Sequence, residues 1–203
     1  LITGLILLTY LTTHLLNHGL GLISLDAMEW GRQGFLLLWR NPLGTLALYG
    51  ALLTHLSLAI WALYERRRLH MAVPELIQLT FGLTIPVLLT VHIVGTRLMH
   101  EFFGVNDSYT LLVVTLWHAS PLSGLRQATL ILIAWTHASI GVHYWLRLKS
   151  WYPRWAPYFL ALALLIPVFG LLGFVNAGRE LANLIARRPE WLEQFLSAAN
   201  LPP

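Results

Sequence analysis

Five long stretches without a charged side chain restrict what this sequence can fold into. Each stretch is 20 or more residues long: Leu1–Leu25, Asn41–Tyr64, Leu76–Thr96, Gln127–Leu146 and Ala156–Gly178. A helix of about 20 apolar residues crosses a hydrocarbon core of ~30 Å, and only helices or closed barrels satisfy their backbone hydrogen bonds there. The pattern predicts an all-α, polytopic transmembrane helix bundle with five spans in this chain.

The predicted spans cover about residues 1–23, 42–64, 76–99, 123–147 and 155–177, and an interfacial helix covers about residues 24–40. Ser24 can cap that interfacial helix and Asn41-Pro42 can end it. Residues 178–203 are expected to form an amphipathic tail of two short helices on the outer side. The first span starts at residue 1 without Met or a leader pattern, so we expect this chain to be an internal piece of a longer polypeptide. Because five spans leave the tail on the outer side, a cytoplasmic partner domain would require a sixth span after Pro203.

The composition agrees with a membrane protein. Hydrophobic residues make up 57% of the chain and charged residues 11%, whereas soluble domains carry about 25% charged residues. The net charge of +4 does not indicate nucleic acid, because the basic residues do not line a face with aromatic residues. Six basic residues lie in the short loops after the second and fourth spans, so the positive-inside rule places these loops in the cytoplasm. They are Arg66, Arg67, Arg68, Arg147, Lys149 and Arg154.

The absence of cysteine limits the chemistry of any metal site. With no Cys, iron–sulfur thiolate ligation and covalent c-type haem are excluded, and histidine or carboxylate ligands remain. An ionisable residue at membrane depth is a functional-site hypothesis by default, although His also forms hydrogen bonds between helices in haem-free structural or transport bundles. Six of the nine histidines fall inside predicted spans: His14, His18, His55, His92, His137 and His143.

Membrane depth predicts how these histidines pair. His14 lies eight residues from the outer end of the first span and His92 lies seven from the outer end of the third. His55 lies nine residues from the inner end of the second span, and His137 lies ten from the inner end of the fourth. Two imidazoles on facing helices can be the two axial ligands of a haem iron. The sequence therefore predicts an outer b-type haem between His14 and His92 and an inner one between His55 and His137.

The remaining polar residues have secondary roles in this scheme. His18 is four residues from His14 and nearer the outer end, so we favour His14 as the ligand and give His18 a propionate or water contact. His143 lies six residues, about 240°, from His137, and its expected partner is a propionate or a lipid head group. Arg97 and Arg126 on the outer side, and Arg147 on the inner side, are further candidate propionate contacts. His70, His100 and His118 are expected to be solvated surface residues.

A polar segment on the outer side has two interpretations. Asn106-Asp107-Ser108-Tyr109 lies close in sequence to Trp117, His118 and Ser120. A quinone head group needs a few hydrogen-bonding groups of this kind in an apolar cleft. An Asx turn that caps a short helix needs no ligand, and we favour that interpretation.

The sequence resembles known haem-binding membrane anchors. Thr3-Gly4, Tyr10, His14-Leu15-Leu16-Asn17 and His55 resemble the cytochrome b anchor of the succinate dehydrogenase and fumarate reductase family. A longer set of motifs is more similar to the six-span, dihaem N-terminal anchor of certain bacterial class III adenylate cyclases. That set is Asp26-Ala27-Met28-Glu29, Trp39-Arg40-Asn41-Pro42, Pro86, Val91 to Arg97, Asn106 to Tyr109, Trp145-Leu146-Arg147, Trp151-Tyr152-Pro153 and Gly173 to Glu180.

The resemblance implies a function. In the two-haem members, His residues of the first and third spans ligate one haem iron and those of the second and fourth spans ligate the other. The similarity implies two haem b groups that sense or transfer electrons from the quinone pool, in a multi-pass protein of the bacterial inner membrane. It also implies a cytoplasmic cyclase domain in the same polypeptide, acting as a homodimer. The alternative is a respiratory anchor subunit of a succinate:quinone or quinol:fumarate oxidoreductase. These 203 residues contain no catalytic site of their own in either case.

Overall fold

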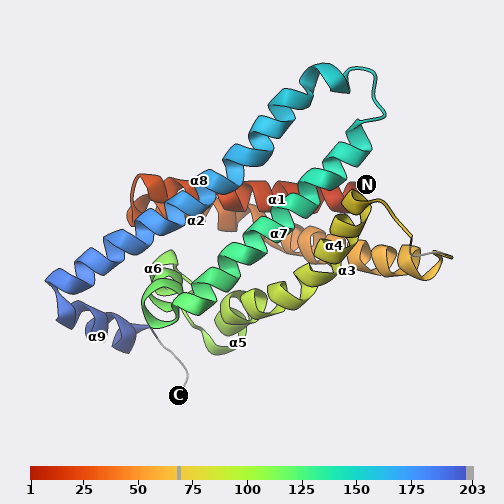
Figure 1. Ribbon diagram of the computed structural model, residues 1–203. Coiled ribbons are helices and arrows are strands. Elements are labelled where there is room, and N and C mark those ends of the chain that lie inside the picture. Colours follow the sequence, from red (N-terminus) through yellow and green to blue (C-terminus); the bar gives the residue numbers. More distant parts are fainter. Residues whose placement is uncertain (68–69, 200–203) are drawn as a thin grey trace.

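The computed structural model describes residues 1–67 and 70–199, and this part of the protein consists of helices and their connections, without a strand (Figure 1). Arg68 of the first basic loop lies outside the described residues. In chain order the elements are α1 (Ile2–Gly19), the 3₁₀ turn η1 (Leu20–Leu22), α2 (Leu25–Trp39), α3 (Pro42–Tyr64), α4 (Val73–Ile93), the π-helical segment η2 (Val94–Leu98), α5 (Met99–Phe103), α6 (Tyr109–Val113), the π-helical segment η3 (Val114–Ala119), α7 (Pro121–Leu146), α8 (Tyr152–Arg187) and α9 (Pro189–Ala198).

Three helices are long and apolar enough to cross a membrane. They are Pro42–Tyr64, the continuous helix Val73–Phe103 and Tyr152–Arg187. Only Ala51 of α3 and no residue of α4 is buried inside the protein, so the apolar side chains of these helices lie on its outside. An apolar surface of this extent is typical of a membrane-facing protein. The protein is therefore an all-α, multi-pass membrane protein.

The prediction of five spans is supported for three helices only, and not for α1 and α7. The physical reason is the polar content of these two helices. Each of them carries two histidines, and α1 adds Asn17 while α7 adds Gln127. The same residues that mark a candidate site therefore lower the mean hydropathy of the helices that carry them.

The helices form two pairs that are joined through α8 and through a direct contact of α1 with α7. Helix α1 packs against α3, helix α4 packs against α7, and α8 packs against both α1 and α7. Within the described residues, α3 packs against neither α4 nor α7. The α3–α4 and α7–α8 connections lie at one end of the bundle, and α2, α6 and α9 lie toward the other (Figure 1). We call these the basic end and the α2 end.

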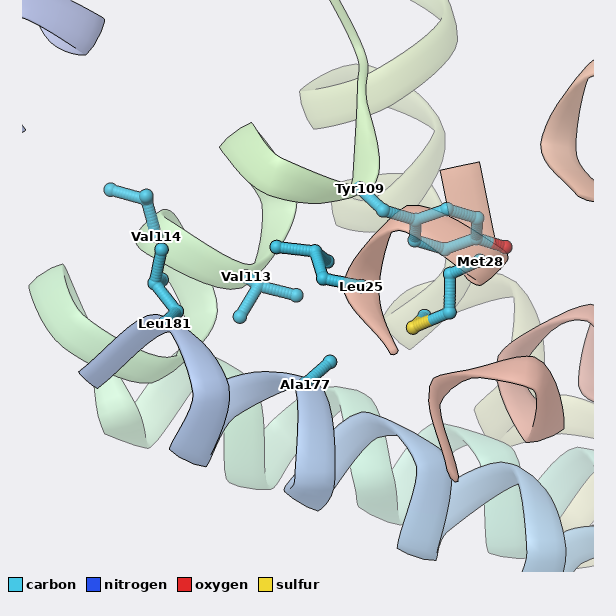
Figure 2. Packing of buried hydrophobic residues seen from close by; sticks show 7 residues of the cluster. All are labelled: Leu25, Met28, Tyr109, Val113, Val114, Ala177 and Leu181. Carbon is cyan, nitrogen blue, oxygen red and sulfur yellow. The ribbon is translucent and has the colours of Figure 1, made fainter. Parts of the chain in front are cut away.

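The α2 end contains the largest cluster of buried apolar side chains (Figure 2). Leu25 and Met28 of α2 contact residues of α6 and η3, and Ala177 and Leu181 of α8 close the cluster from the other side. The amide nitrogen of Asn17 donates a hydrogen bond of 2.8 Å to the Tyr109 hydroxyl at the same place. This packing fixes α1, α2, α6 and α8 relative to one another.

Side-chain caps begin several helices where the sequence places them. Ser24 accepts a hydrogen bond from the Ala27 amide at the start of α2, and Asn41 accepts one from the Gly44 amide at the start of α3. Ser108 caps α6 in the same way. Each cap satisfies an amide that has no partner within its helix.

The helix α8 is longer than the predicted span at residues 155–177. It continues to Arg187 without a break, so the expected tail at 178–203 contributes one separate helix, α9, among the described residues. The charges that begin at Arg179 mark the end of the apolar stretch, but nothing in the local sequence ends the helix before Pro189.

The α1–α8 crossing brings two backbones into direct contact. At Gly173 a side chain would overlap the carbonyl of His18, and at Gly21 it would overlap the backbone of Gly173. Small residues at such a crossing allow close helix packing in membranes.

Trp135 compensates for a proline within α8, and this predicts a stability effect. Pro167 has no N–H for the carbonyl of Ala163, and the Trp135 indole donates a hydrogen bond of 2.7 Å to that oxygen. Replacing Trp135 with Phe leaves the half-buried Ala163 carbonyl without a donor, so we expect a loss of about 1–3 kcal/mol in the free energy of unfolding. Denaturant titration of the purified protein in detergent measures the loss. The control is Trp155→Phe at an exposed position; equal stability of the two variants would contradict this role of Trp135.

Candidate functional site

A single elongated cavity lies between the two helix pairs. Its volume is about 450 Å³, within the range of about 300–1,000 Å³ that is usual for ligand and cofactor sites. Residues of α1, α3, α4 and α7 line it, together with α2 at one end. The four predicted iron ligands, His14, His55, His92 and His137, all line this cavity.

The structure brings the histidines together in the two predicted pairs. The ring centroids of His14 and His92 are 6.1 Å apart, and those of His55 and His137 are 6.3 Å apart. A metal ion bonded to two imidazoles at about 2.0–2.1 Å places their ring centroids about 6 Å apart. Both pairs therefore have the spacing that a shared metal ion requires, before any side chain moves.

The pair near the basic end is oriented through its Nδ1 atoms. His137 Nδ1 donates a hydrogen bond of 3.0 Å to the Gln78 carbonyl, because a carbonyl oxygen can only accept. His55 Nδ1 lies 3.3 Å from the Thr3 hydroxyl. Metal-bound histidines commonly use one ring nitrogen for such a contact and the other for the metal. The Nε2 atoms of His55 and His137 are thus left for a metal.

Two glycines make room for this pair. A Cβ atom on Gly82 would lie 2.8 Å from His137 Cε1, and one on Gly4 would lie 3.5 Å from His55 Cε1. The His137 ring therefore packs directly against the backbone of α4. Sequence reasoning missed Gly82, because a single glycine in an apolar span has many structural explanations.

The pair near the α2 end lies among aromatic rings. Tyr10 is stacked at 5.7 Å from the His14 ring, and Phe35 of α2 lies 5.4 Å from it. His14 Nδ1 is buried without a hydrogen-bond partner among the described residues, and the Gln127 side chain lies next to His92. A buried polar atom without a partner is costly, so its presence in this cavity is consistent with a bound group.

The other two histidines of the spans do not line the cavity. His18 is buried beside His14, at 4.6 Å between ring centroids, and packs edge-on against Tyr109. His143 is exposed, and its Nδ1 lies 2.9 Å from the Tyr152 hydroxyl. His14 and His137 line the cavity whereas His18 and His143 do not, in line with the preference for the first two as ligands. The ligand assignment itself stays a prediction.

The arginines are arranged differently from the sequence-based expectation. Arg97 lines the cavity, but Arg126 and Arg147 are exposed, and Arg147 lies over the Tyr144 ring. Arg32 and Arg40 line the cavity instead. Sequence reasoning assigned these two residues to an interfacial helix and its end, and their buried partner far along the chain could not be read from spacing.

That partner is Asp107, from the polar segment considered for a quinone head group. Its carboxylate is 6% exposed and pairs with Arg32 at 2.6 Å and with Arg40. Ser108 caps α6, while Asn106 and His118 are exposed. The segment therefore has a structural role, and the structure does not bring its members together as one pocket.

His100 is one of the histidines that the sequence places at the surface. Its side chain is 41% exposed, in line with a surface position, but its Nδ1 also lies 2.9 Å from the Val105 carbonyl. The turn at Gly104, which has a positive φ of 65°, folds the chain back and brings Val105 to it.

Comparison of the chain with protein-family models, curated proteins and solved structures gave no match. The fold and the site alone define an all-α membrane protein with a cavity between its helices that is lined by two facing histidine pairs.

Proposed function

We propose that this chain is a dihaem b-type membrane domain that carries electrons between the two halves of the bilayer. The observation that supports this most is the geometry of the two histidine pairs. Four residues from four different helices face one cavity in two pairs, each at the spacing of two ligands of one metal ion. The Nδ1 atoms of His14 and of its neighbour His18 are both buried without a hydrogen-bond partner among the described residues, so neither ring takes part in an interhelical hydrogen bond through that atom.

The residues present fit a haem at each pair. His14 and His92 would hold one iron and His55 and His137 the other; iron with two axial His ligands supplies one-electron transfer without an open coordination site. The Gln78 carbonyl and Thr3 fix the ring orientations of the second pair. The described wall around the second pair is apolar apart from the histidines and Gln78, whereas three arginines and Asp107 line the cavity near the first pair.

The separation of the helix pairs also supports this proposal. Helix α3 packs against neither α4 nor α7 in the described part of the chain. Interiors of proteins are close-packed, so a gap lined by four histidines fits a flat prosthetic group.

The resemblance described above supports a more specific role. In this proposal α1 and α7 also cross the membrane, which makes a five-span bundle in the bacterial inner membrane. The domain exchanges electrons with the quinone pool and, as a homodimer, regulates a class III adenylate cyclase domain on the side of the basic end. A change in the charge of the haem sites would have to shift an equilibrium between two helix arrangements to reach that domain.

The first experiment is a haem count. The chain is produced in bacterial membranes with sufficient haem supply, purified in detergent, and measured by pyridine haemochrome and reduced-minus-oxidised spectra. We expect two haem b groups per polypeptide. His118→Ala, at an exposed position, is the control and should bind the same amount.

The outcomes separate the alternatives. Absence of a b-type spectrum would favour a haem-free structural or transport bundle, and one haem per chain would overturn the four-ligand scheme. For the polypeptide that contains this chain, cyclase activity that differs between quinone-oxidised and quinol-reduced membranes supports the sensor. Copurification with iron–sulfur and flavin subunits would support the respiratory anchor instead.

A further inference from the structure

The α2 end of the cavity carries an excess of positive charge on its wall. The guanidinium groups of Arg32, Arg40 and Arg97 line it, together with one carboxylate, Asp107. In the described part of the wall no other Lys, Arg, Asp or Glu is present. Two further carboxylates lie outside the wall, Glu29 at 2.8 Å from Arg32 and Glu101 at 3.1 Å from Arg97.

Two arginines of this group are held in place by buried contacts. Asp107 binds Arg32 and Arg40 at once, and its side chain is 6% exposed. Burial lowers the pKa of Arg40, and the neighbouring guanidinium groups of Arg97 and Arg32 lower it further. Arg32 and Arg40 share one carboxylate and Arg97 lines the same end of the cavity, so an additional anion there would relieve the repulsion among the guanidinium groups.

The opposite end of the cavity has no such group. The described wall around His55 and His137 contains no charged residue, and its polar side chain apart from the histidines is Gln78, whose Oε1 has no partner. The basic residues of the connecting loops, such as Arg66 and Arg147, do not line the cavity. The two ends thus offer very different surroundings to a bound group.

Resting on the dihaem proposal, we infer that Arg32, Arg40 and Arg97 bind the two propionate carboxylates of the haem held by His14 and His92. Arginine binds carboxylates through two parallel hydrogen bonds, and each of these side chains has five N–H donors. On the cavity wall the three guanidinium groups face one carboxylate, while Glu29 and Glu101 pair with Arg32 and Arg97 from outside the wall, so the propionates would supply the acceptors on the cavity side. In the described part of the cavity wall, no arginine or lysine side chain lies at the end that holds His55 and His137.

The assignment predicts the direction in which the reduction potential of this haem changes when an arginine is removed. A positive charge near the iron stabilises the reduced form, so its removal lowers the midpoint potential of that haem. Loss of one guanidinium also leaves a propionate without a partner, which acts in the same direction. The other haem should not respond.

The experiment uses the full chain with Arg97→Gln and Arg40→Gln, each measured by haem count and potentiometric titration. For each variant we expect the reduced form of the haem at His14 and His92 to be about tenfold less stabilised. This lowers the midpoint potential of that haem by about 59 mV for one electron; loss of that haem would have the same cause. The same haem should be missing from His92→Ala. Arg97→Lys keeps a charge and should recover part of the shift, and Arg179→Gln, exposed and away from the cavity, should leave both potentials unchanged.

The outcomes distinguish this inference from the proposal beneath it. If the unmodified chain binds two haems but Arg40→Gln and Arg97→Gln change neither content nor potential, the arginine assignment is wrong and the dihaem function stands. If the unmodified chain binds none, the function itself fails. Reconstitution with the dimethyl ester of haem is a second test, because its two propionates are neutral. Compared with haem, the ester should bind at least about tenfold more weakly at His14 and His92, and equally well at His55 and His137. An equal affinity of the ester at both histidine pairs would overturn the assignment.

Discussion

Replacing His137 with alanine is expected to remove one of two haem groups, whereas His143→Ala should leave both in place. His137 lines the cavity 6.3 Å from His55 and is oriented by the Gln78 carbonyl. His143 is exposed and contacts Tyr152. The variants form a matched pair, because both remove an imidazole from the same helix. The measurement is haem per polypeptide, and the expected values are one and two.

The other pair of histidines provides the same comparison at the α2 end. His14→Ala should reduce the haem count to one, while His18→Ala should retain two, because His18 packs against Tyr109 and does not line the cavity. The haem that remains in His14→Ala should be the one lost in His137→Ala. If His18→Ala and not His14→Ala removed a haem, the assignment of this ligand would be wrong.

The second large effect is expected at the crossing of α1 and α8. Gly173→Leu places a side chain where the carbonyl of His18 lies, and backbone atoms cannot move aside as a flexible side chain can. Overpacking typically costs about 1–3 kcal/mol and more at rigid sites, so we expect α1 to separate from α8. Since α1 carries His14, the haem count and the unfolding midpoint should both fall.

A matched control tests whether the effect depends on the crossing. Gly50→Leu introduces the same residue into α3, where a side chain would meet no atom within 4 Å. Its stability should be close to that of the unmodified chain. Equal destabilisation of both variants would show that glycine at the crossing has no special role.

Much of the helical architecture is readable from the sequence, for definite physical reasons. Charge-free stretches predict the long helices because charges are costly in hydrocarbon. Ser24 and Asn41 predict helix starts because their side chains accept hydrogen bonds from free amides. The end of α8 was misplaced because Arg179 ends the apolar stretch without ending the helix.

The candidate site was predictable only in part. The pairing of the four histidines follows from their depth in the helices, a quantity that the sequence contains. The contact of Asp107 with Arg32 and Arg40 joins residues 75 and 67 positions apart, and no periodicity encodes such a contact. The same holds for Gly82 against His137, which depends on how α4 and α7 cross.

The way the helix pairs are joined has a consequence for assembly. Helix α1 packs against α3 and α4 packs against α7; α8 contacts both pairs, and α1 also contacts α7 directly. Because α3 packs against neither α4 nor α7 in the described part of the chain, a planar molecule can enter between them with no hydrogen bond inside a helix broken. Insertion from the side, after the helices have formed, is therefore compatible with this architecture.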